Sequence, residues 1–312
     1  MTGRPVRGPP GSPAILPPVL GAILTAMATP FDADLRVDEA STIRLAHHLV
    51  DNGSDGLVMA GTTGEASTLT DDEKVALYRI AKREVGDRAS VVAGTGSNDT
   101  AHSVHLTERA AEVGADAVLV VTPYYNKPPR AGIIGHVEAI AAVGVPVILY
   151  NIPSRSVINM PPDLIAELGE IDNVIAVKQA NPDLVECRQV AETSGLEVFA
   201  GNDDMLYPVL EMGGAGVISV VSHLAGEEMQ AMVAAAGRGD WEDARALDAG
   251  LEELIAALFV TSSPILVKAA LEMTGLIPSG RLRLPLVEAT PVERDILRTV
   301  LERQGILSRA AS

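Results

Sequence analysis

The sequence predicts an α/β protein: a closed (β/α)8 TIM barrel with a C-terminal helical appendage. Two observations carry this prediction. From Leu20 onward, eight short apolar segments alternate with longer amphipathic segments, and glycines close the amphipathic ones. The apolar segments are continuous rather than alternating, which indicates parallel strands that are buried on both faces of a sheet. An open, doubly wound sheet is the alternative, but no G-x-G-x-x-G follows the first strand.

The elements expected in the barrel can be taken in chain order. The strands are residues 21–26, 56–60, 90–93, 117–121, 147–150, 174–177, 198–200 and 217–220. Seven helices separate them, and we expect a left-handed glycine at the end of each, namely Gly53, Gly86, Gly114, Gly144, Gly169, Gly195 and Gly213. The stretch from Thr70 to Glu73 matches a capping box, which marks a helix start.

The pattern changes to helices alone near residue 222, with helices expected at 227–236, 241–257, 264–273 and 291–304. We therefore divide the chain into three parts. Residues 1–19 are a Pro-rich extension that we expect to be disordered. Residues 20–224 form the catalytic barrel, and residues 225–312 form a C-terminal helical region.

Composition excludes several classes of partner. The 312 residues carry a net charge of −17 without a basic cluster, which argues against binding to nucleic acid or to an anionic membrane. No uninterrupted apolar stretch is long enough for a membrane span or a signal sequence. Cys187 is the only cysteine, so an intrachain disulfide is impossible and a reducing cytoplasm fits best. A carboxylate substrate would need local positive charge in its site.

Lys178 directly follows the sixth expected strand, so its amine would emerge where the core ends. Such an amine can attack a carbonyl and form a Schiff base. A lysine that only reaches solvent from a strand end is the alternative. The other lysines lie on a polar helix face (Lys74 and Lys82), in a loop (Lys127) or in a C-terminal helix (Lys268). Since barrel active sites form at the carboxyl ends of the strands, Lys178 is the candidate nucleophile.

Hydroxyl groups accompany Lys178 at the strand ends. Three of the five tyrosines, Tyr124, Tyr125 and Tyr150, lie there, and they could relay protons. The turn from Gly61 to Gly64 could present N–H groups to a small carboxylate. No metal site is expected, because the histidine pair His102 and His105 has no suitably spaced acidic or cysteine companion.

Four motifs at these strand ends resemble, in order, those of the dihydrodipicolinate synthase and N-acetylneuraminate lyase superfamily. They are GTTGE at 61–65, TPYYNKP at 122–128, YNIPSR at 150–155, and Val177-Lys178. The paired threonines, the paired tyrosines and Arg155 favour the dihydrodipicolinate synthase branch. That branch implies the condensation of pyruvate with L-aspartate-4-semialdehyde to 4-hydroxy-tetrahydrodipicolinate, in lysine and diaminopimelate biosynthesis.

The resemblance also implies roles for single residues. Lys178 would form a Schiff base with pyruvate, so no external cofactor is expected. Tyr150 would shuttle protons and would be linked through Thr62 to Tyr125, which reaches the site of a neighbouring subunit in a homotetramer built as a dimer of dimers. The remaining implied contacts are those to the substrates: the carboxylate of pyruvate at Thr63 and the turn at Gly61, the Ile218 carbonyl near the lysine, and the carboxylate of the semialdehyde at Arg155.

Two departures from the family pattern matter. An acidic residue usually follows the nucleophile, and here it is Gln179. Relatives that lysine inhibits have an acidic residue at the position of His102 and a histidine at that of Lys74, so we expect weak or absent inhibition by lysine. Two other functions stay open: a pyruvate-dependent aldolase for sugar acids such as N-acetylneuraminate or 2-keto-3-deoxygluconate, which would not need Arg155, and a non-catalytic barrel that binds a keto acid.

Overall fold

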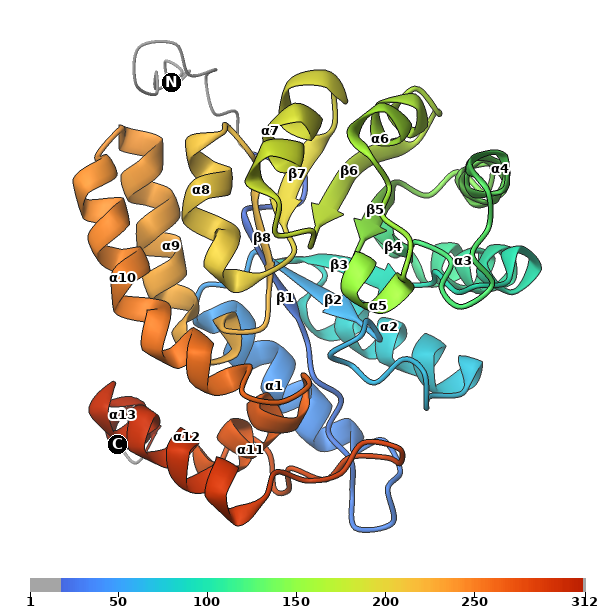
Figure 1. The fold of residues 1–312 in the computed structure, drawn as a ribbon. Coiled ribbons are helices and arrows are strands. Elements are labelled where there is room, and N and C mark those ends of the chain that lie inside the picture. Colours follow the sequence, from blue (N-terminus) through green and yellow to red (C-terminus); the bar gives the residue numbers. More distant parts are fainter. Residues whose placement is uncertain (1–17, 311–312) are drawn as a thin grey trace.

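The computed structural model describes residues 18–310, so residues 1–17 of the expected N-terminal extension lie outside the described part. Eight parallel strands close into a barrel in sequence order, with β8 paired to β1 (Figure 1). The predicted (β/α)8 barrel is confirmed, and each expected strand matches an observed one to within two residues at either end. The strands are β1 (Ile23–Ala26), β2 (Gly56–Met59), β3 (Ser90–Gly94), β4 (Ala117–Val121), β5 (Val147–Asn151), β6 (Val174–Gln179), β7 (Glu197–Ala200) and β8 (Gly216–Ser219).

The strands are apolar throughout because both of their faces are buried. Neighbouring residues of one strand point to opposite faces of the sheet. On β2, Val58 belongs to a small core inside the barrel that also contains Ile148 and Phe199. Leu57, next to it, belongs to the larger core between the sheet and the surrounding helices. Continuous apolar strands are therefore what two concentric cores require.

Helices connect the strands and surround the barrel (Figure 1). They are α1 (Glu39–Asp51), α2 (Asp71–Val85), α3 (Thr100–Val113), α4 (Arg130–Ala141), α5 (Pro153–Ser156), α6 (Pro162–Gly169), α7 (Leu184–Thr193), η1 (Asp203–Met205), α8 (Leu206–Glu211) and α9 (Ser222–Arg238). The capping box at the start of α2 is present: the Thr70 hydroxyl accepts from the Glu73 N–H, and the Glu73 carboxylate accepts from the Thr70 N–H.

Five of the seven glycines expected to be left-handed have a positive φ: Gly53, Gly114, Gly144, Gly195 and Gly213. The expectation is wrong for the other two, where a side chain would clash with nearby backbone atoms. Gly86 has a φ of −60°, and a Cβ there would lie 2.4 Å from the Lys82 carbonyl oxygen. Gly169 is the last residue of α6, and a Cβ there would lie 2.6 Å from the Ser194 carbonyl oxygen. Close backbone packing explains a glycine as well as a left-handed turn does.

The C-terminal region is helical as expected, with α10 (Trp241–Leu258), α11 (Ile265–Met273), α12 (Pro291–Arg303) and a short α13 (Ile306–Ala310) that the sequence did not indicate. The expected boundary at residues 224 and 225 falls inside α9, whose backbone kinks at Ala225. Because α9 packs against β1, we propose that α9 belongs to the barrel and that the appendage begins after Arg238.

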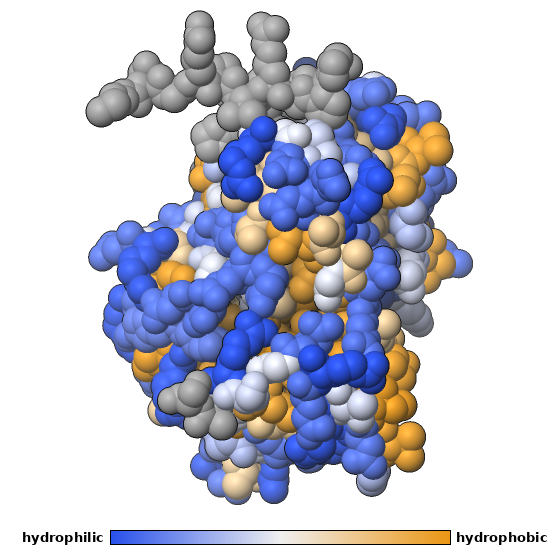
Figure 2. All heavy atoms as spheres, turned by 90° about the vertical axis from the view of Figure 1, so that its left-hand side faces the viewer, coloured by the Kyte–Doolittle hydropathy of each residue, from blue (hydrophilic) through white to orange (hydrophobic). Residues whose placement is uncertain are grey.

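The surface is largely polar on the face that Figure 2 shows, which is the side of α10 in Figure 1. Hydrophilic residues cover most of this face, and apolar residues show between them. None of the helices between residues 18 and 310 is long and apolar enough to cross a membrane.

His223 links the end of β1 to the corner between β8 and α9. Its Nδ1 donates to the Val220 carbonyl oxygen at 2.7 Å, and its Nε2 accepts from the Ala28 N–H at 3.1 Å. Both ring nitrogens are therefore used by a neutral imidazole, and burial lowers the pKa of His223 to about 4.

This lowered pKa predicts a loss of stability in mild acid. An unfolded chain protonates His223 below about pH 6.5, whereas the folded chain does so only near pH 4, so falling pH favours unfolding across this window. Between pH 7 and pH 5, His223 should lower the free energy of unfolding by about 2 kcal/mol. Denaturant titrations should show that His223→Gln loses this part of the pH dependence.

The exposed His105 provides the matched control, because His105→Gln should keep the pH dependence of the unsubstituted chain. Equal pH dependences in the His223→Gln and unsubstituted chains would contradict the neutral state assigned to His223.

Candidate active site

A cavity of about 550 Å³ opens at the carboxyl ends of β2, β3, β4 and β5. Four of the predicted site residues line it: Gly61, Thr62, Tyr150 and Arg155. They come from three elements, namely the turn after β2, strand β5 and helix α5. The barrel thus brings together residues that are nearly 100 positions apart, at the rim where barrel enzymes carry their active sites.

Lys178 does not itself line this cavity, but it is paired with Tyr150, which does, and it lies inside β6 rather than just beyond it. The expected strand ended at Val177, but β6 continues through Gln179 because Lys178 pairs with Tyr150 on β5 and with Phe199 on β7. The Lys178 side chain is buried, and its Nζ lies 4.5 Å from the centre of the Tyr150 ring. Within residues 18–310 it has no hydrogen-bond or ion-pair partner. Its amine is therefore not occupied by another side chain.

The turn after β2 carries the paired threonines. Thr62 is exposed and lines the cavity, whereas Thr63 is buried and does not. The Thr29 hydroxyl stabilises the turn by donating a hydrogen bond to the Gly64 carbonyl oxygen at 2.7 Å. At its far side Glu65 has a φ of +58°, a conformation that costs a non-glycine residue free energy. The surroundings of the turn must therefore stabilise it.

Arg155 supplies positive charge to the cavity wall. It belongs to α5, a single helical turn that begins with Pro153 and ends at Ser156, and the next residue, Val157, has a left-handed φ of +68°. The side chain is exposed and lines the cavity. No acidic side chain between residues 18 and 310 pairs with it. The guanidinium is thus available for a carboxylate ligand, which it can bind through two parallel hydrogen bonds.

Two other predicted residues lie away from the cavity wall. Ile218 is buried in the core inside the barrel. Tyr125 is 86% exposed, has a φ of +72°, and does not line the cavity of its own chain. This conformation directs one tyrosine of the pair outward, while Tyr124 lines the cavity.

Asp203 is a buried carboxylate near Lys178. The sequence placed it at a strand end but indicated no role for it. It accepts hydrogen bonds from the Ser219 hydroxyl and, at 3.2 Å, from the N–H groups of Val220 and Val221. Burial raises the pKa of Asp203, and the hydrogen bonds and the charge of Lys178 oppose this effect. Asp203 thereby ties the end of β8 to the loop after β7 on the Lys178 side of the barrel.

A cluster of charged side chains lines the far part of the same cavity. Asp71 contacts His102 Nε2 at 2.9 Å and Lys74 Nζ at 3.6 Å. Burial raises the pKa of Asp71, but the hydrogen bond from His102 and the nearby charges outweigh it and leave the pKa below its usual value. Lys74 was expected on a polar helix face; it lies on α2, where it is buried and faces Asp71. Asn98 and Tyr124 complete this wall.

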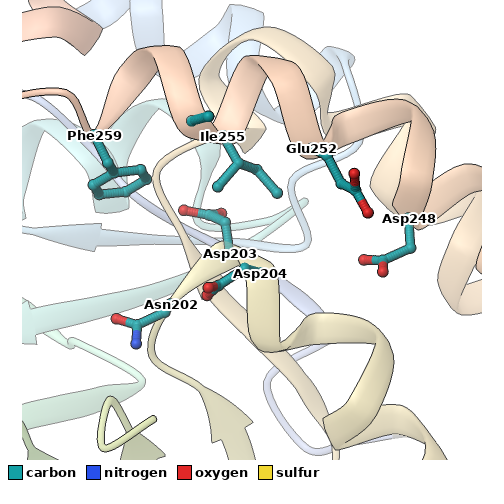
Figure 3. A pocket seen from close by; sticks show the side chains of 8 residues that line it. Asn202, Asp203, Asp204, Asp248, Glu252, Ile255 and Phe259 are labelled. Atoms are coloured by element: carbon teal, nitrogen blue, oxygen red, sulfur yellow. The ribbon is translucent and has the colours of Figure 1, made fainter.

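A second cavity, of about 520 Å³, lies between the loop after β7 and α10 (Figure 3). Figure 3 shows carboxylates on both of its sides. Burial, Glu252 and Asp204 raise the pKa of Asp248 to about 6. This cavity would repel an anionic substrate, so the cavity beside Lys178 and Arg155 is the better candidate active site.

No group of three or more metal-ligating side chains occurs in the described part of the chain. Of the histidine pair weighed from the sequence, His102 instead bonds to Asp71. The candidate site therefore consists of an amine, hydroxyls and a guanidinium.

Comparison with known proteins identifies the family. The model of the Dihydrodipicolinate synthetase family matches residues 19–304. A 4-hydroxy-tetrahydrodipicolinate synthase from Moorella thermoacetica is 50% identical over 290 residues, which cover 92% of this chain and 99% of that protein. One from Mycobacterium leprae (strain TN) is 45% identical and covers 94% and 97%.

Solved structures give the same result. The dihydrodipicolinate synthase DapA-2 of Bacillus anthracis has a TM-score of 0.88 at 44% identity, covering 91% of this chain and 98% of that one. The lysine-bound enzyme of Cyanidioschyzon merolae has a TM-score of 0.90 at 38% identity, covering 92% and 99%. The family model, the sequence identities and the barrel fold agree, and the chain belongs to the dihydrodipicolinate synthetase family.

Proposed function

We propose that this enzyme condenses pyruvate with L-aspartate-4-semialdehyde to give 4-hydroxy-tetrahydrodipicolinate, through a Schiff base on Lys178. The observation that carries the proposal is the unpaired Lys178 amine, which lies 4.5 Å from the ring of Tyr150. Tyr150 and Arg155 both line the cavity. The names of the relatives, at up to 50% identity, support the same reaction.

The proposed reaction begins at the keto carbon of pyruvate. The amine of Lys178 attacks this carbon, and the carbinolamine loses water to give an imine. Loss of a proton from the methyl group gives an enamine, which forms a carbon–carbon bond to the aldehyde carbon of the second substrate. The amino group of that substrate then attacks the imine carbon, closes the ring and releases Lys178. Overall, the reaction releases one molecule of water for each pair of substrates that it condenses.

The side chains around Lys178 would divide the remaining tasks. The Tyr150 phenol would carry protons to and from the carbinolamine, in a relay with Thr62. Thr63 and the backbone N–H groups of the turn at Gly61 would bind the pyruvate carboxylate. The Ile218 carbonyl would lie near the lysine.

Arg155 would hold the carboxylate of the semialdehyde. Its place on the cavity wall, without an acidic partner in the described chain, favours an acidic second substrate over a sugar acid aldehyde. In a body of charge −17, this guanidinium would offset the repulsion of an anionic substrate.

Tyr125 would complete the relay in a neighbouring subunit. Its exposure of 86% and its absence from the cavity of its own chain support this placement. We therefore propose a homotetramer, built as a dimer of dimers, in which Tyr125 crosses an interface. Sedimentation that shows a fully active monomer would contradict it.

Borohydride reduction in the presence of pyruvate should leave a covalent adduct on Lys178, detected by peptide mass spectrometry. Lys178→Ala should lose the adduct, while Lys127→Ala, which removes an exposed loop lysine, should retain it. An unmodified Lys178 would contradict both the synthase and the aldolase and would leave a barrel that only binds a keto acid.

Arg155→Ala should separate the synthase from the sugar-acid aldolase. The variant should trap pyruvate as before but lose roughly a hundredfold in kcat/KM for the semialdehyde, because the charged hydrogen bonds to its carboxylate are gone. Arg130→Ala is the control, since Arg130 pairs with Asp163 and Glu167 outside the cavity. Unchanged steady-state kinetics in Arg155→Ala would remove the main reason for choosing the semialdehyde.

Free lysine should inhibit the enzyme weakly or not at all. The wall where an acidic group would be needed carries Lys74 and His102, and Asp71 is already bonded to both. A cationic ligand therefore meets like charge without a free carboxylate. Lysine titrations should give an inhibition constant above a millimolar, and His102→Glu should lower it. A submillimolar constant for the unsubstituted enzyme would refute this assignment.

A further inference from the structure

Glu65 follows the turn that carries Thr62 and Thr63, and it is held from far along the chain. Its side chain is fully buried, and its backbone is left-handed with a φ of +58°. The Thr62 carbonyl oxygen accepts from the Glu65 N–H at 3.1 Å, so the position of Glu65 and the shape of the turn are directly linked. Whatever holds the Glu65 carboxylate also holds the turn.

Both carboxylate oxygens of Glu65 are bound by the C-terminal region. Lys268, on α11, donates from Nζ to Oε1 at 2.7 Å, and the Lys268 side chain is also fully buried. The backbone N–H of Arg283, in the segment between α11 and α12, donates to Oε2 at 3.0 Å. The contacts span more than 200 residues of sequence.

The same two C-terminal residues clamp the neighbouring loops. The Arg283 guanidinium binds the Glu73 carboxylate and the Thr68 carbonyl oxygen, on the segment that leads from the turn into α2. Lys268 Nζ lies 4.2 Å and Arg283 Cζ 4.5 Å from the ring centre of Phe31, which follows β1. The appendage thus holds the loops after β1 and β2 together.

A buried ion pair contributes little to the free energy of folding. Burying two charges costs most of what their attraction returns, and apolar residues of similar size often stabilise a fold as well. What the pair adds is a defined position, because a buried carboxylate must meet its donors at hydrogen-bond distance. In this chain, the residue positioned in this way is Glu65, at the end of the turn that carries Thr62 and Thr63.

We infer that Lys268 and Glu65 are positioning residues for the reaction: the C-terminal region holds the Thr62–Thr63 turn in the shape that binds the carboxylate of pyruvate. This inference rests on the proposed function. It assigns the appendage a part in substrate binding, although no residue of α10 to α13 lines the cavity beside Lys178.

The test compares Lys268→Met with the unsubstituted enzyme at a temperature well below both unfolding midpoints. Borohydride trapping on Lys178 is measured against pyruvate concentration, together with steady-state kinetics for both substrates. We expect the pyruvate concentration for half-maximal trapping to rise on the order of tenfold or more, since small displacements of binding groups have effects of this size. The KM for the semialdehyde should change much less, because Arg155 lies on another element.

Arg294→Met is the matched control. Arg294 pairs with Glu272 at 2.7 Å within the appendage and does not touch the turn, so the variant should lower thermal stability without changing the pyruvate requirement. If Lys268→Met does not fold, Glu65→Gln decides, because it keeps the size of the side chain and removes its charge. A raised pyruvate requirement in that variant supports the inference, and an unchanged one overturns it.

The outcomes also separate the inference from the function on which it rests. If the unsubstituted enzyme traps no pyruvate, the proposed function fails. If it traps pyruvate and the folded Lys268→Met or Glu65→Gln chain does so at the same pyruvate concentration, the function stands and the positioning role is overturned.

Discussion

The structure depends on the closure of eight parallel strands, each buried on both faces. Parallel pairing brings all carboxyl ends to one rim, and the register of neighbouring strands decides which side chains meet there. Lys178 is paired directly with Tyr150, so the two side chains leave the sheet on the same face one strand spacing apart. The contact between the Lys178 amine and the Tyr150 ring is therefore a consequence of the hydrogen-bond ladder.

Charge is distributed unevenly over this scaffold. The chain as a whole carries −17, and the cavity between the loop after β7 and α10 is lined by carboxylates. The cavity beside Lys178 instead carries Arg155 and Lys74 on its walls. For anionic substrates, such a local reversal of charge selects one of two cavities of similar volume.

Much of this arrangement could be predicted from the sequence because it depends on local patterns. Apolar runs between turns located eight strands, and the place of Lys178 at the sixth strand end singled it out among the lysines. Long-range contacts could not be found in this way. The sequence placed Lys268 only in a C-terminal helix, yet it is fully buried against Glu65, and no periodicity links residues so far apart. The burial of Lys74 could not be predicted for the same reason, since other elements also form the cavity beside it.

Gln179 and Lys178 are neighbours on β6, but their side chains point to opposite faces of the sheet. Gln179 follows Lys178 directly, and alternation along the strand turns its side chain away from the barrel interior. Its Oε1 accepts from Asn151 Nδ2 at 2.8 Å, while its Nε2 is buried without a partner in the described chain. A carboxylate, which the family resemblance leads us to expect at this position, would accept the same bond without leaving a donor unpaired. An unpaired buried donor costs about 1–3 kcal/mol. We therefore expect the departure at Gln179 to affect the free energy of folding rather than the Lys178 amine.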